Sequence, residues 1–290
     1  MTATREPYAR LSEFEASKPV CFDASMSDKS ETDTARDAGG RPVDLAGRVA
    51  LVTGASSGLG RRFAQVLAAH GAAVVATARR ADRLTALADE IEAAGGRCLP
   101  LALDVTDAEQ IGPAIGAAED AFGPVDILVN NAGIPDAQYA TKMSVELVDQ
   151  VLDTNLRAPF LLSCEVARRL IDRELPGRIV NISSVAAFNY GGGGAALYSI
   201  SKTGVNRLTE TLAVEWAKFG INVNAIAPGM FTSEMTDGML QRIGNVIPSF
   251  PRKRIGEPPN LDSTLLYLVA PASEMVTGTV IRVDDGQGPR

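Results

Sequence analysis

The chain has 290 residues, of which 46% are hydrophobic and 22% are charged, a composition typical of a soluble globular protein. Its formal net charge of −7 at pH 7 argues against nucleic acid as a partner, because phosphate binding needs basic surface. The sequence contains neither an apolar run that would span a bilayer nor the apolar stretch of a secretory signal. We therefore expect a cytoplasmic protein that binds neither nucleic acid nor a membrane.

Residue types that bind metals or act as nucleophiles are scarce. The three cysteines, Cys21, Cys98 and Cys164, lie far apart without C-x-x-C spacing, which disfavours a disulfide framework and a thiolate zinc site. His70 is the single histidine and follows an apolar helical pattern, so a place near a helix C-terminus is favoured over catalysis. We therefore expect reduced thiols, no metal site and no Ser-His-Asp triad.

Residues 1–44 are rich in Ser, Thr, Asp, Glu, Lys and Arg and show no sustained apolar period. Such a segment buries too little apolar surface to fold alone, so we expect a flexible N-terminal extension. Its cluster of Tyr8, Leu11 and Phe14 is also compatible with a helix that docks a partner.

Residues 45–290 alternate apolar, β-branched runs with helical patterns such as 60–70 and 83–95. Near-continuous apolar strands separated by helices indicate a parallel sheet that is covered on both faces. Right-handed crossovers then give an α/β, three-layer Rossmann fold with a doubly wound, seven-stranded parallel sheet in one domain. The strand-like runs are residues 48–53, 72–77, 98–104, 126–130, 177–182, 221–226 and 279–283.

A glycine-rich stretch, TGASSGLG, follows the first strand-like run at residues 53–60. Between a strand and a helix, such glycines let backbone N–H groups and the helix N-terminus hold a pyrophosphate, whereas taken alone they would indicate only a tight turn. We therefore expect a dinucleotide cofactor to contact Gly54, Ser56, Ser57, Gly58, Leu59 and Gly60.

The end of the second strand-like run bears on the choice of cofactor. An acidic residue there accepts the ribose 2′-hydroxyl of NAD(H), whereas an arginine receives the 2′-phosphate of NADP(H). Here Ala78 is followed by Arg79 and Arg80. The sequence predicts NADP(H), with Arg79 as the contact; NAD(H), with both arginines solvated at a helix start, is the alternative.

Tyr198 and Lys202 lie four positions apart, after the glycine run 191–194. On a helix this spacing leaves about 5–6 Å between the two Cβ atoms. A tyrosine exchanges protons near neutral pH if its pKa falls by about three units, which requires about 4 kcal/mol. A lysine cation roughly 5.5 Å away supplies about 3 kcal/mol at an effective dielectric of 20. The pattern predicts Tyr198 as a general acid/base tuned by Lys202, against the alternative of a surface pair.

Several short motifs occur in a fixed order along residues 45–286. In order and spacing they resemble the short-chain dehydrogenases/reductases, and among these the 3-oxoacyl-thioester reductases, followed by polyol and gluconate dehydrogenases. The motifs are TGASSGLG (53–60), NNAG (130–133), the asparagine of DTNL (153–156), NISS (181–184), Tyr198-x-x-x-Lys202 and PG (228–229).

The resemblance implies that Asn155, Ser184, Tyr198 and Lys202 form the catalytic set. Ser184 would position the substrate carbonyl, and Asn155 would support a proton path to Lys202, unless it is only a polar residue that kinks a helix. A homo-oligomer, dimer or tetramer, is implied through the helices that follow Asn155 and Tyr198. The further cofactor contacts implied are Asp104, Val105, Asn131, Ala132, Gly133, Tyr198, Lys202, Pro228, Gly229 and Ser233, with Asn131 also structural.

One segment departs from the family pattern, and another is expected to determine substrate specificity. VDDG (283–286) stands where V-D-G-G is common, so the last turn is expected to differ. Residues 230–254 are rich in Met, Phe and Pro, which suits a flexible apolar lid over the substrate or, equally, a subunit contact. We expect an oxidoreductase that interconverts a ketone and a secondary alcohol; a regulatory protein that binds the cofactor without turnover is the alternative.

Overall fold

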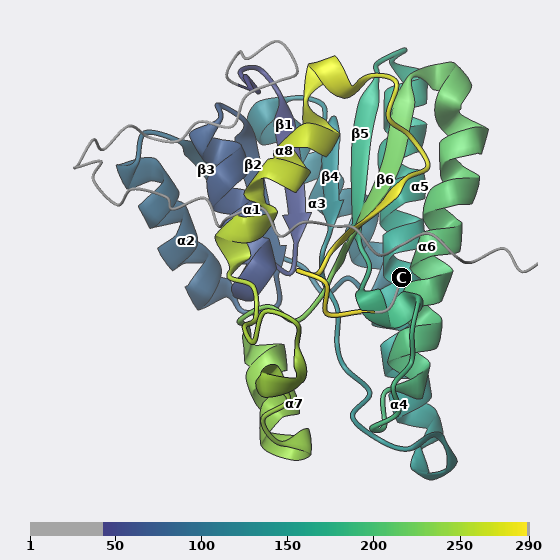
Figure 1. Cartoon of the computed structure of the whole chain (residues 1–290). Coiled ribbons are helices and arrows are strands. Elements are labelled where there is room, and N and C mark those ends of the chain that lie inside the picture. Colours follow the sequence, from purple (N-terminus) through teal and green to yellow (C-terminus); the bar gives the residue numbers. More distant parts are fainter. Residues whose placement is uncertain (1–42, 289–290) are drawn as a thin grey trace, which may run out of the picture. The chain divides into compact units, whose positions relative to one another are not determined.

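A computed structural model of the protein describes residues 43–288 (Figure 1). Seven parallel strands form one sheet in the order β3-β2-β1-β4-β5-β6-β7, which confirms the predicted doubly wound Rossmann fold. Each strand overlaps its predicted run, although β6 extends two residues further, to Pro228. The strands are β1 Val49–Thr53, β2 Ala73–Ala78, β3 Arg97–Ala102, β4 Ile127–Asn130, β5 Gly177–Ile182, β6 Ile221–Pro228 and β7 Val280–Val283.

The central strands are apolar throughout because both faces of the sheet are covered. In β1, Ala50 and Val52 belong to one hydrophobic core, whereas Val49 and Leu51 belong to the other. Burial on both faces removes the alternation of apolar and polar residues that marks a half-exposed strand. The strands could therefore be predicted from continuous apolar runs in the sequence.

Helices cover the two faces of the sheet in separate groups (Figure 1). On one face lie α1 (Gly58–Ala69), α2 (Ala81–Ala93) and α8 (Asp262–Val269), and on the other lie α3 (Ala108–Phe122), α5 (Ala158–Asp172) and α6 (Ala196–Trp216). α4 (Val145–Leu152) runs into α5 through a π-helical segment, Asp153–Arg157. α7 (Glu234–Ile243) follows β6 and projects past the carboxyl end of the sheet (Figure 1).

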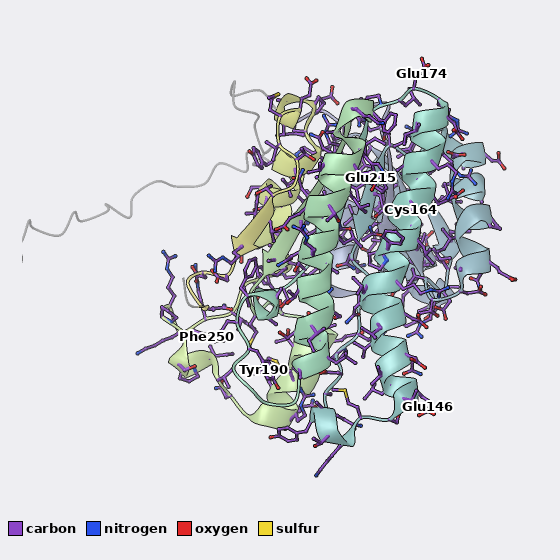
Figure 2. All side chains as sticks on the ribbon, turned by 90° about the vertical axis from the view of Figure 1, so that its right-hand side faces the viewer. Glu146, Cys164, Glu174, Tyr190, Glu215 and Phe250 are labelled. Atoms are coloured by element: carbon purple, nitrogen blue, oxygen red, sulfur yellow. The ribbon has the colours of Figure 1, made fainter. Side chains whose placement is uncertain are left out.

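Two details of the sequence have simple positions in the fold. His70 terminates α1, as predicted, and its Nδ1 lies 2.9 Å from the carbonyl oxygen of Val66. Cys98 and Cys164 are free thiols; Cys164 lies on the α5 side of the face that Figure 2 shows. Cys21, the Tyr8 cluster and nearly all of the predicted extension, residues 1–44, lie outside the described residues. Within residues 43–288, no helix is both long and apolar enough to cross a bilayer.

The glycine run before α6 has a geometric cause. Gly192, Gly193 and Gly194 have φ angles of +89°, +83° and +75°, a left-handed region that residues with a side chain rarely adopt. A Cβ atom on Gly194 would lie 3.2 Å from the carbonyl carbon of Gln138. The glycines therefore let the chain pass close to the loop after β4 before it enters α6.

The VDDG departure also has a structural consequence. Asp285 adopts a left-handed φ of +51°, a conformation that glycine takes at lower cost. Its carboxylate forms ion pairs with Arg252 at 3.1 Å and with Arg254 at 2.7 Å. The aspartate thus ties the end of the segment 230–254 to the C-terminal turn, an arrangement that glycine would not provide.

Candidate active site

A cleft of about 900 Å³ opens at the carboxyl edge of the sheet. Of the catalytic residues implied by the sequence, Ser184, Tyr198 and Lys202 line it, while Asn155 is fully buried and is not among the lining residues. All of the predicted cofactor residues except Gly60 also line the cleft. The ones that line it are Gly54, Ser56, Ser57, Gly58, Leu59, Arg79, Asp104, Val105, Asn131, Ala132, Gly133, Tyr198, Lys202, Pro228, Gly229 and Ser233.

The glycine loop forms one wall of the cleft. Gly54 and Gly58 have left-handed φ angles of +66° and +54°, which explains the need for glycine at both positions. Gly60 has a packing role instead, because a Cβ there would lie 2.3 Å from Nδ2 of Asn131. That amide donates to the carbonyl oxygen of Thr53 at 2.9 Å and so joins β1 to the end of β4, as the structural role predicted for Asn131 requires.

The two arginines after β2 differ in their contacts. Arg79 is exposed at the cleft, and its charge contributes to lowering the pKa of Asp104. Burial acts to raise that pKa, but hydrogen bonds from Thr106 and the charge of Arg79 outweigh it. Arg80 donates from Nη2 to the hydroxyls of Ser56 and Ser57, both at 2.9 Å. Sequence reasoning preferred Arg79 and missed this contact between Arg80 and the glycine loop.

Tyr198 and Lys202 lie on α6, as predicted, and the ammonium of Lys202 is 5.7 Å from the centre of the Tyr198 ring. Lys202 is only 4% exposed, and its Nζ donates to the carbonyl oxygen of Ile182 at 2.7 Å. Because a buried ammonium is poorly solvated, burial lowers the pKa of Lys202 to about 8.

The predicted direction of the Tyr198 shift is wrong for the protein alone. Burial raises the pKa of Tyr198, a hydrogen bond with Ser184 acts to lower it, and the charge of Asp136 raises it further. Desolvation of the phenolate is the largest of these causes. Because burial lowers the pKa of Lys202 to about 8, the cation expected beside the phenol is itself partly neutral near that pH.

The two serines of NISS point to different partners. Ser183 is buried and donates from its hydroxyl to the main chain of Lys202 and to the side chain of Asn206, so its role is to join β5 to α6. Ser184 lines the cleft together with Tyr198, and its hydroxyl accepts from the N–H of Ala186 at 3.1 Å. This placement supports the choice of Ser184 over Ser183 as the residue next to the reacting group.

Asn155 lies in the π-helical segment between α4 and α5 and is fully buried. Its side chain accepts a hydrogen bond from the N–H of Ile134 and donates to the carbonyl oxygen of the same residue, each at 2.9 Å. A Cβ on Gly133 would lie 3.4 Å from Oδ1 of Asn155 and 3.5 Å from Nζ of Lys202. Asn155 therefore fixes the backbone at 133–134 beside the lysine, and π-helical turns often occur at such sites.

Asp136 is a functional residue that the sequence did not reveal. It is 2% exposed, and its Oδ2 accepts hydrogen bonds from the N–H groups of Leu197 at 2.8 Å and Tyr198 at 3.0 Å. These bonds cap α6, whose own N-cap residue, Ala195, has no hydroxyl or carboxylate to offer. The cap comes from a loop 61 residues away, so no local pattern could have indicated it.

The wall opposite the glycine loop is built by the chain after β6. A Cβ on Gly229 would lie 2.5 Å from Oε1 of Gln287 and 2.9 Å from Asp284, so only glycine fits beside the C-terminal turn. Ser233 caps α7 by accepting from the N–H of Thr236 at 3.1 Å. Its Cβ would lie 3.4 Å from a Cβ on Gly58, which places the start of α7 against the glycine loop.

Comparison with known proteins decides the family. The model of the short chain dehydrogenase family matches residues 48–243. Over 246 residues the chain is 37% identical to a 3-oxoacyl-(acyl-carrier-protein) reductase of Vibrio cholerae, covering 84% of this chain and 98% of that relative. The chain belongs to the short-chain dehydrogenase/reductase family.

Solved structures of the family agree in fold. A short-chain dehydrogenase/reductase from Mycobacterium marinum matches with a TM-score of 0.82 and 35% identity, over 86% of this chain and 98% of that one. A structure from Agrobacterium tumefaciens, assigned as a 2-deoxy-D-gluconate 3-dehydrogenase with bound NADP, matches with a TM-score of 0.77 and 38% identity, over 85% and 98%. As a member of this family, the protein is an NAD(P)-dependent oxidoreductase that acts on a small molecule.

The cleft fits a nicotinamide dinucleotide. The left-handed glycines bring the loop backbone to the N-terminus of α1, where N–H groups and the helix dipole favour a pyrophosphate. Arginines stand at the end of β2, where the adenosine ribose of a dinucleotide is read. When bound, the nicotinamide supplies or accepts the hydride.

The charge of Asp136 provides a test of the site. Asp136→Asn keeps an oxygen that can accept from the start of α6 but removes the charge that raises the pKa of Tyr198. That pKa is therefore expected to fall, so that alcohol oxidation, which needs the phenolate, becomes half-maximal at a lower pH. The pH dependence of kcat measures the shift, with the exposed Asp149→Asn as the control. A midpoint that stays or rises in Asp136→Asn contradicts this assignment.

Proposed function

We propose that the protein is an NADP(H)-dependent oxidoreductase that interconverts a ketone and a secondary alcohol and resembles a 3-oxoacyl-thioester reductase in its substrate. The observation that supports this most is that Ser184, Tyr198 and Lys202 line one cleft together with the glycine loop. A hydroxyl donor, an ionisable phenol and a buried ammonium are the groups that proton transfer to or from a carbinol oxygen requires.

The proton chemistry can be assigned to the chain's own residues. In ketone reduction, Ser184 holds the carbonyl oxygen by a hydrogen bond, and Tyr198 donates its proton to that oxygen as negative charge develops there. The raised pKa of Tyr198 keeps the phenol protonated around neutral pH, which suits this acid role. In oxidation, Tyr198 must act as the base, and any further lowering of its pKa has to come from charge that binding brings to the cleft.

Lys202 and Asn155 are assigned to supporting proton transfer by the Tyr198 phenol. The Lys202 ammonium donates to the carbonyl oxygen of Ile182. A Cβ on Gly133 would lie within 3.5 Å of both this ammonium and the amide oxygen of Asn155. We assign Lys202 to stabilising the phenolate after proton donation, and Asn155 to supporting a water path that returns a proton to Lys202. A pKa of about 8 allows Lys202 to take and release that proton near neutral pH.

The substrate class has two competing assignments. The 37% identity to the Vibrio cholerae reductase favours a 3-oxoacyl thioester, whereas the likeness to the Agrobacterium tumefaciens structure favours a polyol or sugar acid. NAD(H) is the alternative cofactor, although that structure contains NADP. A cofactor-binding regulatory protein without turnover is disfavoured because the catalytic set is complete. A screen of ketones and alcohols by NADPH absorbance separates the three.

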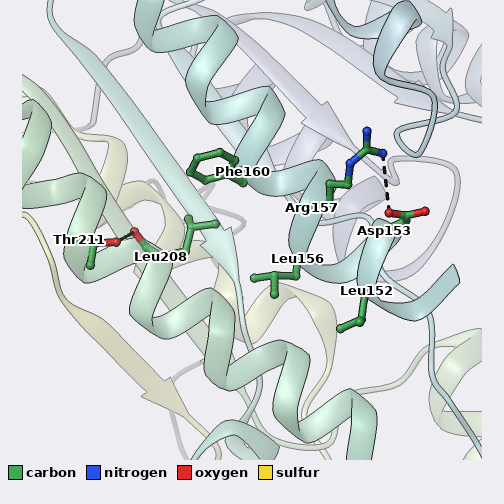
Figure 3. Close-up of a pocket in the computed structure, with 7 residues that line it drawn as sticks. All are labelled: Leu152, Asp153, Leu156, Arg157, Phe160, Leu208 and Thr211. Carbon is green, nitrogen blue, oxygen red and sulfur yellow. Dashed lines mark hydrogen bonds and ion pairs between the residues drawn. The ribbon is translucent and has the colours of Figure 1, made fainter. Parts of the chain in front are cut away.

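We also propose that the chain forms a homodimer or homotetramer through α5 and α6. A groove of about 480 Å³ lies between them, lined by apolar side chains such as Leu156 and Phe160 (Figure 3). Phe160 is 45% exposed and Val214, further along α6, is 82% exposed. Apolar side chains in this arrangement would be covered by the same face of a second copy, as a two-fold interface requires.

The first prediction concerns the acid and its neighbour. Tyr198→Phe removes the transferable proton and should lower kcat by about 10²–10⁴-fold, and Lys202→Met should also lower it strongly. Steady-state rates on the best substrate of the screen measure the effect, with cofactor binding as a check on folding. The matched controls are Tyr190→Phe, at an exposed tyrosine, and Lys218→Met, at the end of α6. Turnover that survives both active-site changes disproves the mechanism.

The second prediction concerns the cofactor. Arg79→Ala should weaken NADPH binding by about tenfold and NADH binding much less, because only NADPH carries the 2′-phosphate that an arginine can hold. Fluorescence titration of the two reduced cofactors measures both constants. Arg61→Ala, which removes a half-buried arginine on α1 that pairs with Glu90, is the control. An unchanged preference in Arg79→Ala removes the argument for NADP(H) from this residue.

The third prediction concerns assembly. Val214→Glu places a charge on the exposed face of α6 and should dissociate the oligomer, so that the protein in solution has a lower molar mass. Light scattering after size exclusion measures the mass, and thermal unfolding checks the fold. Ala86→Glu, at an exposed site on α2, should leave the mass unchanged. A wild-type protein that is already monomeric refutes the proposed assembly.

A further inference from the structure

Glu234, the first residue of α7, lies beside the glycine loop and the start of α2. Its carboxylate accepts hydrogen bonds from Nη1 of Arg80 at 3.1 Å and from the Ser57 hydroxyl at 3.3 Å. It also forms an ion pair with Arg83, in the first turn of α2. Neither the family motifs nor the local sequence pattern draws attention to this residue.

The Glu234 carboxylate lies within a cluster of groups that can bind an anion. Arg80 contacts the hydroxyls of Ser56 and Ser57 as well as Glu234, so both guanidinium groups and the loop serines converge on one place. Hydrogen bonds from Arg83 and Arg80, together with their charges, hold the pKa of Glu234 below its usual range, so this group is ionised at neutral pH. An anion supplied by the chain itself therefore occupies Arg80 and Arg83, whereas Arg79, assigned above to the 2′-phosphate, is not one of its partners.

We propose that Glu234 is a specificity-determining residue that competes with the 2′-phosphate of the cofactor for Arg80 and Arg83. This inference takes its ligand class from the proposed function, because only a cofactor with a phosphate on the adenosine ribose presents a second anion to these arginines. Two anions on the same guanidinium groups repel each other, so the phosphate must displace the carboxylate or share the arginines at a cost.

The same contact links the cofactor site to the substrate side of the cleft. Glu234 belongs to the first turn of α7, the helix that Ser233 caps and that the segment 230–254 contains. A phosphate that displaces the carboxylate therefore acts on the helix next to the substrate. Displacing the carboxylate costs little free energy, because Glu234 and both arginines are largely solvent-exposed and exposed ion pairs contribute little to stability.

Adenosine 2′,5′-bisphosphate and adenosine 5′-monophosphate isolate the contribution of the phosphate. Glu234→Gln keeps the size of the side chain and removes its charge, so the bisphosphate should bind about tenfold more tightly and the monophosphate within about twofold of wild type. Calorimetric titration at low and high salt measures both, and the gain should shrink as salt rises. Asp237→Asn removes an exposed charge from the same helical turn and should change neither constant appreciably.

Several outcomes overturn the inference. It fails if Glu234→Gln leaves bisphosphate binding unchanged, if both ligands tighten equally, or if Asp237→Asn produces the same gain. Glu234→Ala repeats the test with a second side chain, and thermal unfolding of each variant verifies that the protein is folded.

The wild-type protein tests the proposed cofactor separately. If it binds NADH more tightly than NADPH and Glu234→Gln shifts the preference toward NADPH, the proposed cofactor is wrong but the role of Glu234 stands. If it prefers NADPH and Glu234→Gln has no effect, the proposed cofactor stands and the role of Glu234 is wrong.

Discussion

The buried ammonium of Lys202 is the constraint on which the arrangement of the site depends. A cation removed from water is costly unless it is hydrogen-bonded, and here the ammonium donates to the carbonyl oxygen of Ile182 at the end of β5. This requirement fixes α6 against β5, a contact that Ser183 reinforces from the next residue along the chain. Tyr198 then stands one turn before the lysine and lines the cleft. The position of the phenol is thus a consequence of where a lysine can be buried.

Much of this could be predicted from the sequence, and what could not has one physical cause. The strands were recognisable because burial on both faces leaves continuous apolar runs, and the motif residues reached the cleft because the carboxyl ends of parallel strands share one edge. Asp136 and Glu234 were missed because their partners lie 61 and 154 residues away. The direction of the Tyr198 pKa was mistaken for the same reason. Helical spacing gives the distance to Lys202, but only the folded chain gives the desolvation of the phenol and the charge of Asp136.

The departures from the family pattern are compensated locally. Asp285 replaces a common glycine and adopts a left-handed conformation, and its carboxylate pairs with arginines at the end of the segment 230–254. The glycine run before α6 makes the backbone there less rigid. It also permits the close approach to Gln138 that leaves the Asp136 loop next to the start of α6. In both cases an unusual backbone residue serves a contact with a distant segment.

These contacts give the segment 230–254 a particular kind of attachment. Near its start, Glu234 forms exposed ion pairs with Arg80 and Arg83, at the beginning of α2. At its end, Arg254 pairs with Asp285 of the C-terminal turn. Phe231, by contrast, is buried in one of the two hydrophobic cores. Exposed pairs are weak and sensitive to salt, whereas the cores beneath the sheet are apolar and closely packed. Breaking the ion pairs at the two ends of this segment would therefore cost far less than displacing Phe231 or Lys202, both of which are buried. If the segment is a lid, as one of the two interpretations of its composition predicts, its movement is expected to break these pairs while Phe231 stays packed in the core.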